Sequence, residues 1–393
     1  MATIVAALLP RFALAVAAGG REALLQGPAA LAPEPGGGEL IGEVSAAAAG
    51  AGVHPGMRLG EALARCPSLA LVPGDPVGVA DAWERVLVSL EGIGAAVESG
   101  PPGIACFDAR GLRRLHGGSL DGVFAATRSA LRRPARLGAG PSRFCALAGA
   151  HRARARHPVI VRGAQDLARE SVELLREREQ TAHLATDLRR LGVETLGELA
   201  ALSRAAMADR FGAAGLLAHE LAHGRDEPLI PRTPRERLEE QLDLPEANSG
   251  PQLRRALAVL IDRLLARREL RGRTVRSVVL AAILVEGGTW RDRVVFREAT
   301  ADAARMRLAL GGHLDALPAP AQALRLTADG LGPPPPQSGA LFDDGDAQRR
   351  DRLRDAVRQA RAAAGPDAAL RVLLVDPDSR VPERRAVLTP FER

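Results

Sequence analysis

The first 160 residues alternate between short apolar runs and amphipathic stretches. Thr3–Leu9 and Ile104–Asp108 are short and largely apolar, so we predict two buried strands. Ala80–Leu90 and Ser119–Arg132 space their apolar residues at helical intervals. Alternating strands and helices are typical of a layered α/β domain, which we expect to end near Val161.

The pattern from Leu167 to about Leu221 is helical throughout. Within it, Leu188–Leu202 predicts two short helices that break at Gly192, with Thr195 as the N-cap of the second. This is typical of a helix-hairpin-helix, whose backbone N–H groups face a phosphate, and an ordinary helix pair is the alternative. The candidate DNA-binding residues in the hairpin are Gly192, Val193 and Thr195.

A third pattern follows a proline-rich linker, Pro228–Pro234. It predicts the order strand, helix, strand, strand, helix, strand, with a Gly287-Gly288 turn between the middle two strands. This order of elements is the split βαβ unit. The predicted elements are Leu238–Leu244, Gln252–Leu270, Val275–Val285, Thr289–Phe296, Ala301–Leu314 and Ala323–Thr327. Beyond them, Arg349–Ala364 predicts a basic helix and Ala369–Val375 a strand.

Composition narrows the class of protein. The chain has 393 residues, 46% hydrophobic and 25% charged, which predicts a soluble protein of several domains without a membrane helix. Three widely spaced cysteines exclude a disulfide scaffold and favour the cytoplasm. Every basic residue other than histidine is arginine. One arginine cluster is either a phosphate-facing patch or a solvated helix face, and its candidate DNA-binding residues are Arg267, Arg268, Arg271, Arg273 and Arg276.

The string His219-Glu220-Leu221-Ala222-His223 matches the H-E-x-x-H pattern of zinc peptidases. Gly224 follows at once and would end the helix, so the second histidine would lie in a fraying turn. A zinc peptidase therefore stays a remote alternative. No nucleophile elbow or Walker loop is present, and the residues alone reveal no active site.

Five segments in order resemble the Y-family translesion DNA polymerases, namely Gly52–Pro76, Ile104–Gly118, Leu137–Ala153, Leu188–Leu202 and Gly224–Arg232. The resemblance implies a right-hand architecture of mixed α+β domains. It implies a palm at 1–18 and 80–162, fingers at 19–79, a helical thumb at 165–232, a split βαβ little finger at 236–330, a proline-rich linker at 331–348 and a tail at 349–393.

The chain departs from this family at the metal site. Alignment on Phe12 and Val16 puts Leu8 where the family carries its first aspartate, and Gly103 and Ile104 where it carries its second acidic pair. No acid occurs in the first 20 residues. The resemblance therefore implies no catalytic residue, no bound metal and no cofactor, because two-metal phosphoryl transfer needs carboxylates. An active translesion polymerase remains the alternative.

A Y-family body without its metal site resembles the ImuB-like branch of the family. That resemblance implies a non-catalytic adaptor in DNA damage tolerance and SOS mutagenesis, located in the cytoplasm at the nucleoid. Its implied partners are DNA, the β sliding clamp, an error-prone replicative-type DNA polymerase and a RecA-like accessory protein. The clamp-binding residues implied are Gln337, Leu341 and Phe342, which follow four consecutive prolines.

Overall fold

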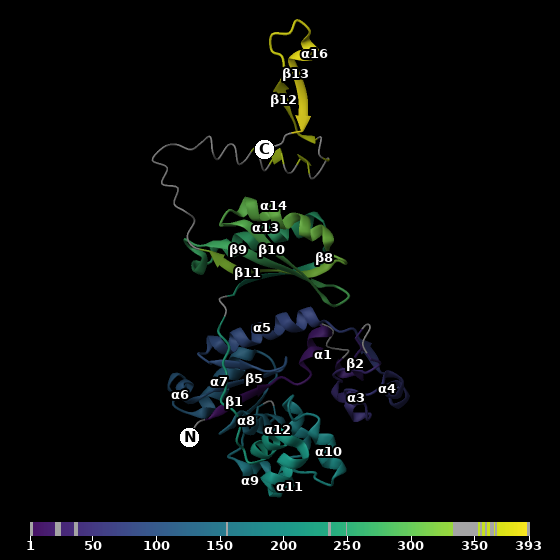
Figure 1. The fold of residues 1–393 in the computed structure, drawn as a ribbon, viewed down its shortest axis with the longest axis vertical. Coiled ribbons are helices and arrows are strands. Elements are labelled where there is room, and N and C mark those ends of the chain that lie inside the picture. The colour runs from purple at the N-terminus through teal and green to yellow at the C-terminus, as the bar shows by residue number, and fades with distance from the viewer. Residues whose placement is uncertain are drawn as a thin grey trace. The chain divides into compact units, whose positions relative to one another are not determined.

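The computed structural model shows a fold of mixed helices and sheets (Figure 1). It describes residues 3–19, 25–34, 38–154, 156–234, 237–248, 250–332, 353, 356–357, 360–361, 365 and 368–390. The chain divides into two compact units, Met1–Pro333 and Pro334–Arg393.

The first sheet of the larger unit has five strands in the order β4-β5-β1-β6-β7. β1 lies at the centre and pairs antiparallel with both β5 and β6. The two strands predicted first, at the N-terminus and at Ile104–Asp108, are thus confirmed and are direct neighbours. The strands are β1 (Ile4–Leu8), β4 (Val97–Ser99), β5 (Ile104–Asp108), β6 (Arg136–Gly140) and β7 (Val159–Ile160).

Helices cover both faces of this sheet. Val5, Ala7 and Phe107 share a core with α5 (Pro76–Gly92) and α7 (Leu120–Leu131), which confirms both predicted helices. On the other face, Ala6 and Cys106 pack against α8 (Arg143–Arg152). Glycine lets α8 approach closely, because a Cβ on Gly138 would lie 2.1 Å from the Ala150 amide nitrogen. The short helices α1 (Phe12–Ala17) and α6 (Arg110–Leu115) follow β1 and β5.

A small separate core lies between α1 and α5 in the sequence, around Ile41, Ala48 and Val53. It is built from α3 (Ala46–Gly50) and α4 (Leu59–Arg65), beside a parallel pair of strands, β2 (Ala29–Leu31) and β3 (Ala70–Val72).

The segment after the first sheet is helical, as predicted. Thr195 and Glu198 form a capping box at the start of α11, and Gly192 adopts φ +81°, a left-handed conformation suited to glycine. The predicted helix pair around Gly192 is therefore confirmed. The elements are α9 (Ala164–Leu167), η1 (Val172–Glu177), α10 (Leu184–Arg190), α11 (Leu196–Ala201) and α12 (Arg204–Ala222).

The second sheet has the antiparallel order β10-β9-β11-β8, with α13 and α14 over one face (Figure 1). This confirms the predicted split βαβ order. Its elements are β8 (Leu238–Asn248), α13 (Pro251–Ala266), η2 (Arg268–Leu270), β9 (Thr274–Leu284), β10 (Thr289–Thr300), α14 (Ala303–Gly311), η3 (Gly312–Ala316) and β11 (Ala321–Gly332).

Two helix ends differ from the prediction. The helix expected to reach Leu270 stops at Ala266, because Arg267 turns to an extended conformation and its guanidinium reaches Glu240 on β8 at 2.5 Å. The helix expected over Ala301–Leu314 is shorter and continues as a 3₁₀ turn after Gly311. Apolar periodicity alone does not report such ends.

The smaller unit contains an antiparallel hairpin of β12 (Leu370–Leu374) and β13 (Ala386–Pro390), joined through α16 (Pro382–Arg385). The predicted strand at Ala369–Val375 is confirmed. Gln337, Leu341 and Phe342 lie outside the described residues, as does most of the predicted Arg349–Ala364 helix. In the described parts of the chain, no helix is both long and apolar enough to cross a membrane.

Candidate functional site

The three positions that align with the family's acidic residues lie together at one end of the β1–β5 pair. Leu8 is the register partner of Ile104, and the Leu9 amide donates to the Gly103 carbonyl at 2.8 Å. Leu8 and Ile104 are half-buried and pack on the cluster formed by Ala6, Cys106 and other residues on that face of the sheet. The alignment positions therefore meet in space, and their side chains form an apolar surface.

Gly103 has a backbone that disfavours any side chain. Its φ is +106°, which L-residues rarely adopt. A Cβ there would lie 3.1 Å from the Leu9 carbonyl oxygen and 3.2 Å from the Phe12 Cβ, tighter than ordinary contact. An aspartate at this position would meet both backbone strain and crowding.

The acid on the neighbouring strand β4 is held by an arginine. Glu98 on β4, opposite Cys106, binds the Arg143 guanidinium and accepts from the Ile230 amide at 2.5 Å. Cys106 itself is buried, and burial raises the pKa of its thiol to about 12, so it stays protonated. Within the residues that the structure describes, no three His, Cys, Asp or Glu side chains gather so as to hold a metal ion.

Asp108 lies at the opposite end of β5, paired with Ile4. Its oxygens accept from the Arg110 amide and from the Arg110 guanidinium, both at 2.8 Å. Partial burial opposes ionisation, and these hydrogen bonds outweigh it and lower the pKa of Asp108. This carboxylate is thus tied to the start of α6.

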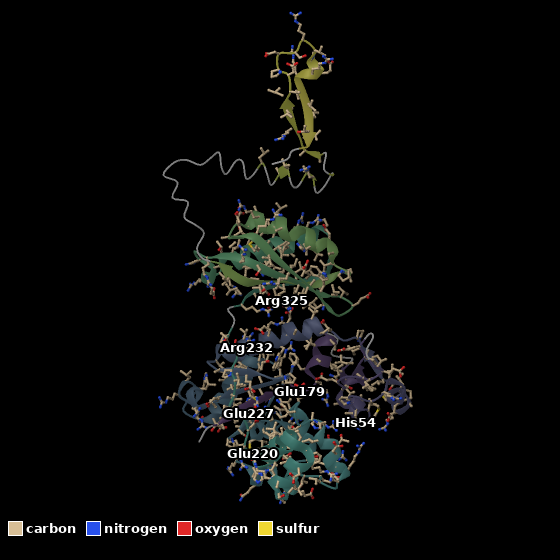
Figure 2. All side chains as sticks on the ribbon, viewed as in Figure 1. His54, Glu179, Glu220, Glu227, Arg232 and Arg325 are labelled. Carbon is tan, nitrogen blue, oxygen red and sulfur yellow. The ribbon has the colours of Figure 1, made fainter. Side chains whose placement is uncertain are left out.

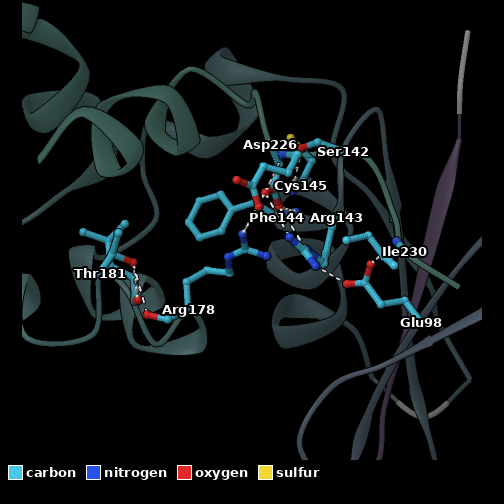
Figure 3. A network of polar contacts seen from close by, with 11 residues as sticks. Glu98, Ser142, Arg143, Phe144, Cys145, Arg178, Thr181, Asp226 and Ile230 are labelled. Carbon is cyan, nitrogen blue, oxygen red and sulfur yellow. Dashed lines mark hydrogen bonds and ion pairs between the residues drawn. The ribbon is translucent and has the colours of Figure 1, made fainter. Parts of the chain in front are cut away.

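Asp226 is the centre of a polar network that the sequence analysis did not identify (Figure 3). Its side chain is fully shielded from solvent. It accepts from the Arg143 guanidinium at 3.2 and 3.3 Å and from the Phe144 amide at 3.1 Å, and Arg178 pairs with it at 3.3 Å. The network ties α8, the helical segment and the linker after α12 together, and a buried acid of this kind has no signature in apolar periodicity.

The predicted phosphate-facing hairpin uses its amides internally. The Glu198 carboxylate accepts from the Glu194 amide at 2.8 Å and the Thr195 amide at 2.9 Å. The Val193 amide donates to the Leu188 carbonyl at 2.9 Å. The hydrogen bonds from the Glu194 and Thr195 amides lower the pKa of Glu198, so these two amides are satisfied within the chain, and phosphate binding by Gly192, Val193 and Thr195 stays a prediction.

The five arginines predicted to bind DNA have different environments. Arg268, Arg271 and Arg276 are exposed, and Arg276 donates to the Arg297 carbonyl at 3.2 Å. Arg273 is half-buried. Arg267 is held by Glu240 and by the Glu239 carbonyl, at 2.5 and 2.8 Å. The exposed members are free to face a phosphate backbone.

The H-E-x-x-H histidines are engaged with the backbone. His219 is 7% exposed, and its Nε2 lies 3.1 Å from the Leu202 carbonyl. His223 Nδ1 lies 2.8 Å from the His219 carbonyl, and Glu220 pairs with Arg225. Figure 2 labels Glu220 on the helical segment. Each contact leaves the other ring nitrogen able to ligate, but within the described residues no third His, Cys, Asp or Glu gathers with this pair, so the arrangement does not complete a zinc site.

Part of the chain matches a known family model. Residues 9–196 match the model of the impB/mucB/samB family. Over this range, the chain is a homologue of the Y-family DNA polymerases. The resemblance drawn from the sequence is thereby confirmed. The matched range contains Gly103 and Ile104, and it begins one residue after Leu8, the last residue of β1.

Solved structures are also similar to this chain. A Y-family DNA polymerase chimera of Dbh and Dpo4 is 15% identical, covers 84% of this chain and 98% of its own, and has a TM-score of 0.49. DinB from Sulfolobus solfataricus is 16% identical, with coverages of 83% and 98% and a TM-score of 0.49. A Dbh ternary complex is 16% identical, with coverages of 84% and 99% and a TM-score of 0.47. No curated protein matches.

Proposed function

We propose that this protein is a non-catalytic, ImuB-like adaptor of DNA damage tolerance and induced mutagenesis. It would link DNA and the β sliding clamp to an error-prone replicative-type polymerase and a RecA-like accessory protein, at the nucleoid. The observation that carries the proposal is the apolar chemistry at the family's acidic positions, Leu8, Gly103 and Ile104.

Two-metal phosphoryl transfer needs carboxylate oxygens that bridge both ions and neutralise the developing charge. Leucine and isoleucine have no atom that can ligate magnesium. Gly103 has no side chain, and its positive φ and close neighbours oppose one. The acids Glu98 and Asp226 are each paired with Arg143. These features support a polymerase-like body that holds DNA and partners without extending a primer.

Primer extension tests the proposal directly. Purified protein with a primer–template, all four nucleotides and either magnesium or manganese should add no nucleotide, while an active Y-family polymerase in the same buffer extends the primer. Template-directed extension that persists after repeated purification would contradict the proposal.

An active translesion polymerase is the second candidate, favoured by the family match over residues 9–196 and the homology to the Y-family DNA polymerases that it supports. If the protein does extend primers, a carboxylate beside β5 must ligate the metal, and Glu98 on β4, the register partner of Cys106, is the candidate. Glu98→Gln should then abolish extension, whereas Glu227→Gln, whose side chain is 70% exposed, should leave it unchanged.

A further inference from the structure

A cavity of about 220 Å³ lies in the larger unit at the N-terminal end of α5, outside the Leu8–Ile104 region. Its walls come from α1, α5, the Gly287-Gly288 turn and β11. The lining includes three arginines far apart in the sequence, Arg85, Arg133 and Arg325, and one acid, Asp75. Three guanidinium groups around a cavity of this size call for an anionic occupant.

The charges beside the cavity do not cancel. Four guanidinium groups surround two carboxylates, so two positive charges have no counter-charge within this cluster. Its members are Arg85, Arg237, Arg291, Arg325, Asp81 and Glu239. Asp81 is 3% exposed, yet its distances to Arg237, Arg291 and Arg325 are 3.5, 3.6 and 3.8 Å, which are ion pairs longer than hydrogen bonds.

Hydrogen-bond donors beside the cavity lack acceptors. Arg85 Nη1 and Arg237 Nε are shielded from solvent without a hydrogen-bond partner. Burial, together with the charge of Arg325, lowers the pKa of Arg85 to about 10. A buried donor left without an acceptor is costly, so an occupant with several acceptor oxygens would relieve the site.

The remaining lining also suits an anion. Arg133 makes no ion pair within the described residues, and its guanidinium carbon lies 6.0 Å from the centre of the Phe12 ring. Both oxygens of Asp75 are engaged, by the Gly78 amide and by the Thr289 hydroxyl, each at 2.8 Å. Asp75 also caps α5, whose positive N-terminal end offsets its charge.

We propose that this cavity binds a phosphate group. A phosphate offers three or four strong acceptor oxygens in a geometry that guanidinium groups bind in pairs. Arg85 lies on α5, Arg133 lies between α7 and β6, and Arg325 lies on β11 of the second sheet. A phosphate bound by all three would therefore connect the helices that cover the first sheet to the second sheet. This inference goes beyond the proposed function and does not depend on whether the protein is catalytic.

Titration calorimetry and thermal melting with sodium pyrophosphate test the site, against sodium chloride of equal ionic strength. Pyrophosphate should bind one site and raise the melting temperature. Arg85→Gln with Arg133→Gln should weaken binding by about tenfold or more, because each removes a charged hydrogen bond. Arg114→Gln, an exposed arginine on α6, is the matched control and should bind normally.

Because Arg85 is partly buried, its replacement affects stability as well as binding. The single variant Arg133→Gln is therefore the one that keeps the fold. It should melt as the parent protein does and still bind pyrophosphate more weakly. A pyrophosphate affinity that is immeasurable, or equal in the parent and in Arg133→Gln, would overturn the proposal.

A second titration identifies the source of the phosphate. If pyrophosphate competes with a short DNA duplex, and Arg133→Gln weakens both, the ligand is a backbone phosphate. If pyrophosphate binds without displacing DNA, the ligand is a free phosphate compound. Either result supports the site, whereas primer extension by the protein, or a failure to bind the clamp, would bear on the proposed function alone.

Discussion

Gly103 determines whether a metal-binding side chain could be restored at its position. Because its φ is +106° and an added Cβ would crowd Leu9 and Phe12, we expect Gly103→Ala to destabilise the protein by about 1–3 kcal/mol. Urea unfolding measures this difference.

Gly117 is the control for Gly103. Its φ is +76°, and an added Cβ would meet nothing within 4 Å. Gly117→Ala therefore carries the conformational strain without the crowding and should cost less. Equal losses in the two variants would mean that contact with Leu9 and Phe12 does not matter.

Asp226 should be the most sensitive charged residue of the chain's buried network. Asp226→Asn removes the charge that faces Arg143 and Arg178, both nearly buried, and we expect a loss of about 3–5 kcal/mol. Denaturant unfolding measures the loss, with the exposed neighbour change Glu227→Gln as the control, expected to stay within about 0.5 kcal/mol. A nearly neutral Asp226→Asn would show that the two guanidinium groups find other partners.

At the scale of elements, the sequence predicted those whose apolar residues lie on one face or in one buried run. The strands β1, β5, β9 and β10 and the helices α5, α7 and α13 follow from such patterns. The early end of α13 did not, because it depends on Arg267 reaching Glu240, which lies 27 residues earlier in the chain. Local periodicity contains no information about a partner that only the folded chain brings near.

The arginine cluster after α13 gives an element-scale prediction. Changing Arg268, Arg271 and Arg276 to Gln should weaken DNA binding uniformly across sequences. The slope of log affinity against log salt should fall by about one for each DNA phosphate that an arginine no longer neutralises. Binding measured by fluorescence anisotropy at several salt concentrations gives this slope.

Arg267 is the matched control, because its guanidinium is held by Glu240 and the Glu239 carbonyl. Arg267→Gln should lower the melting temperature and leave the salt slope nearly unchanged. A triple variant with the parental slope would remove this surface from the DNA interface.

For the molecule as a whole, the candidate site could be predicted by alignment, and its surroundings could not. Leu8, Gly103 and Ile104 were chosen from the sequence and do meet in the sheet. The cavity near Arg85 joins residues more than 200 positions apart, such as Asp75 and Thr289, so only the fold reveals it. Long-range ion pairs leave no repeat or spacing in the sequence.

Clamp binding is the remaining prediction for the whole molecule, and it depends on Leu341 and Phe342. Four prolines precede this apolar pair and Asp343-Asp344 follows it, a composition that favours extended chain and water over burial in a core. Such a pair usually serves a pocket on a partner. Burying both side chains is worth roughly 3–6 kcal/mol before the cost of ordering the segment, which suits a micromolar contact.

Changing Leu341 and Phe342 to Ala should therefore abolish co-elution with the β sliding clamp. The melting temperature should stay at the parental value, because the prolines and acids around this pair do not favour its burial in a core. Ser338→Ala, a polar change within the same segment, is the control and should retain clamp binding. If the double variant still co-elutes with the clamp, the contact lies elsewhere, and the apolar hairpin of β12 and β13, where Val372, Leu374 and Leu388 are each more than 60% exposed, is the next surface to change.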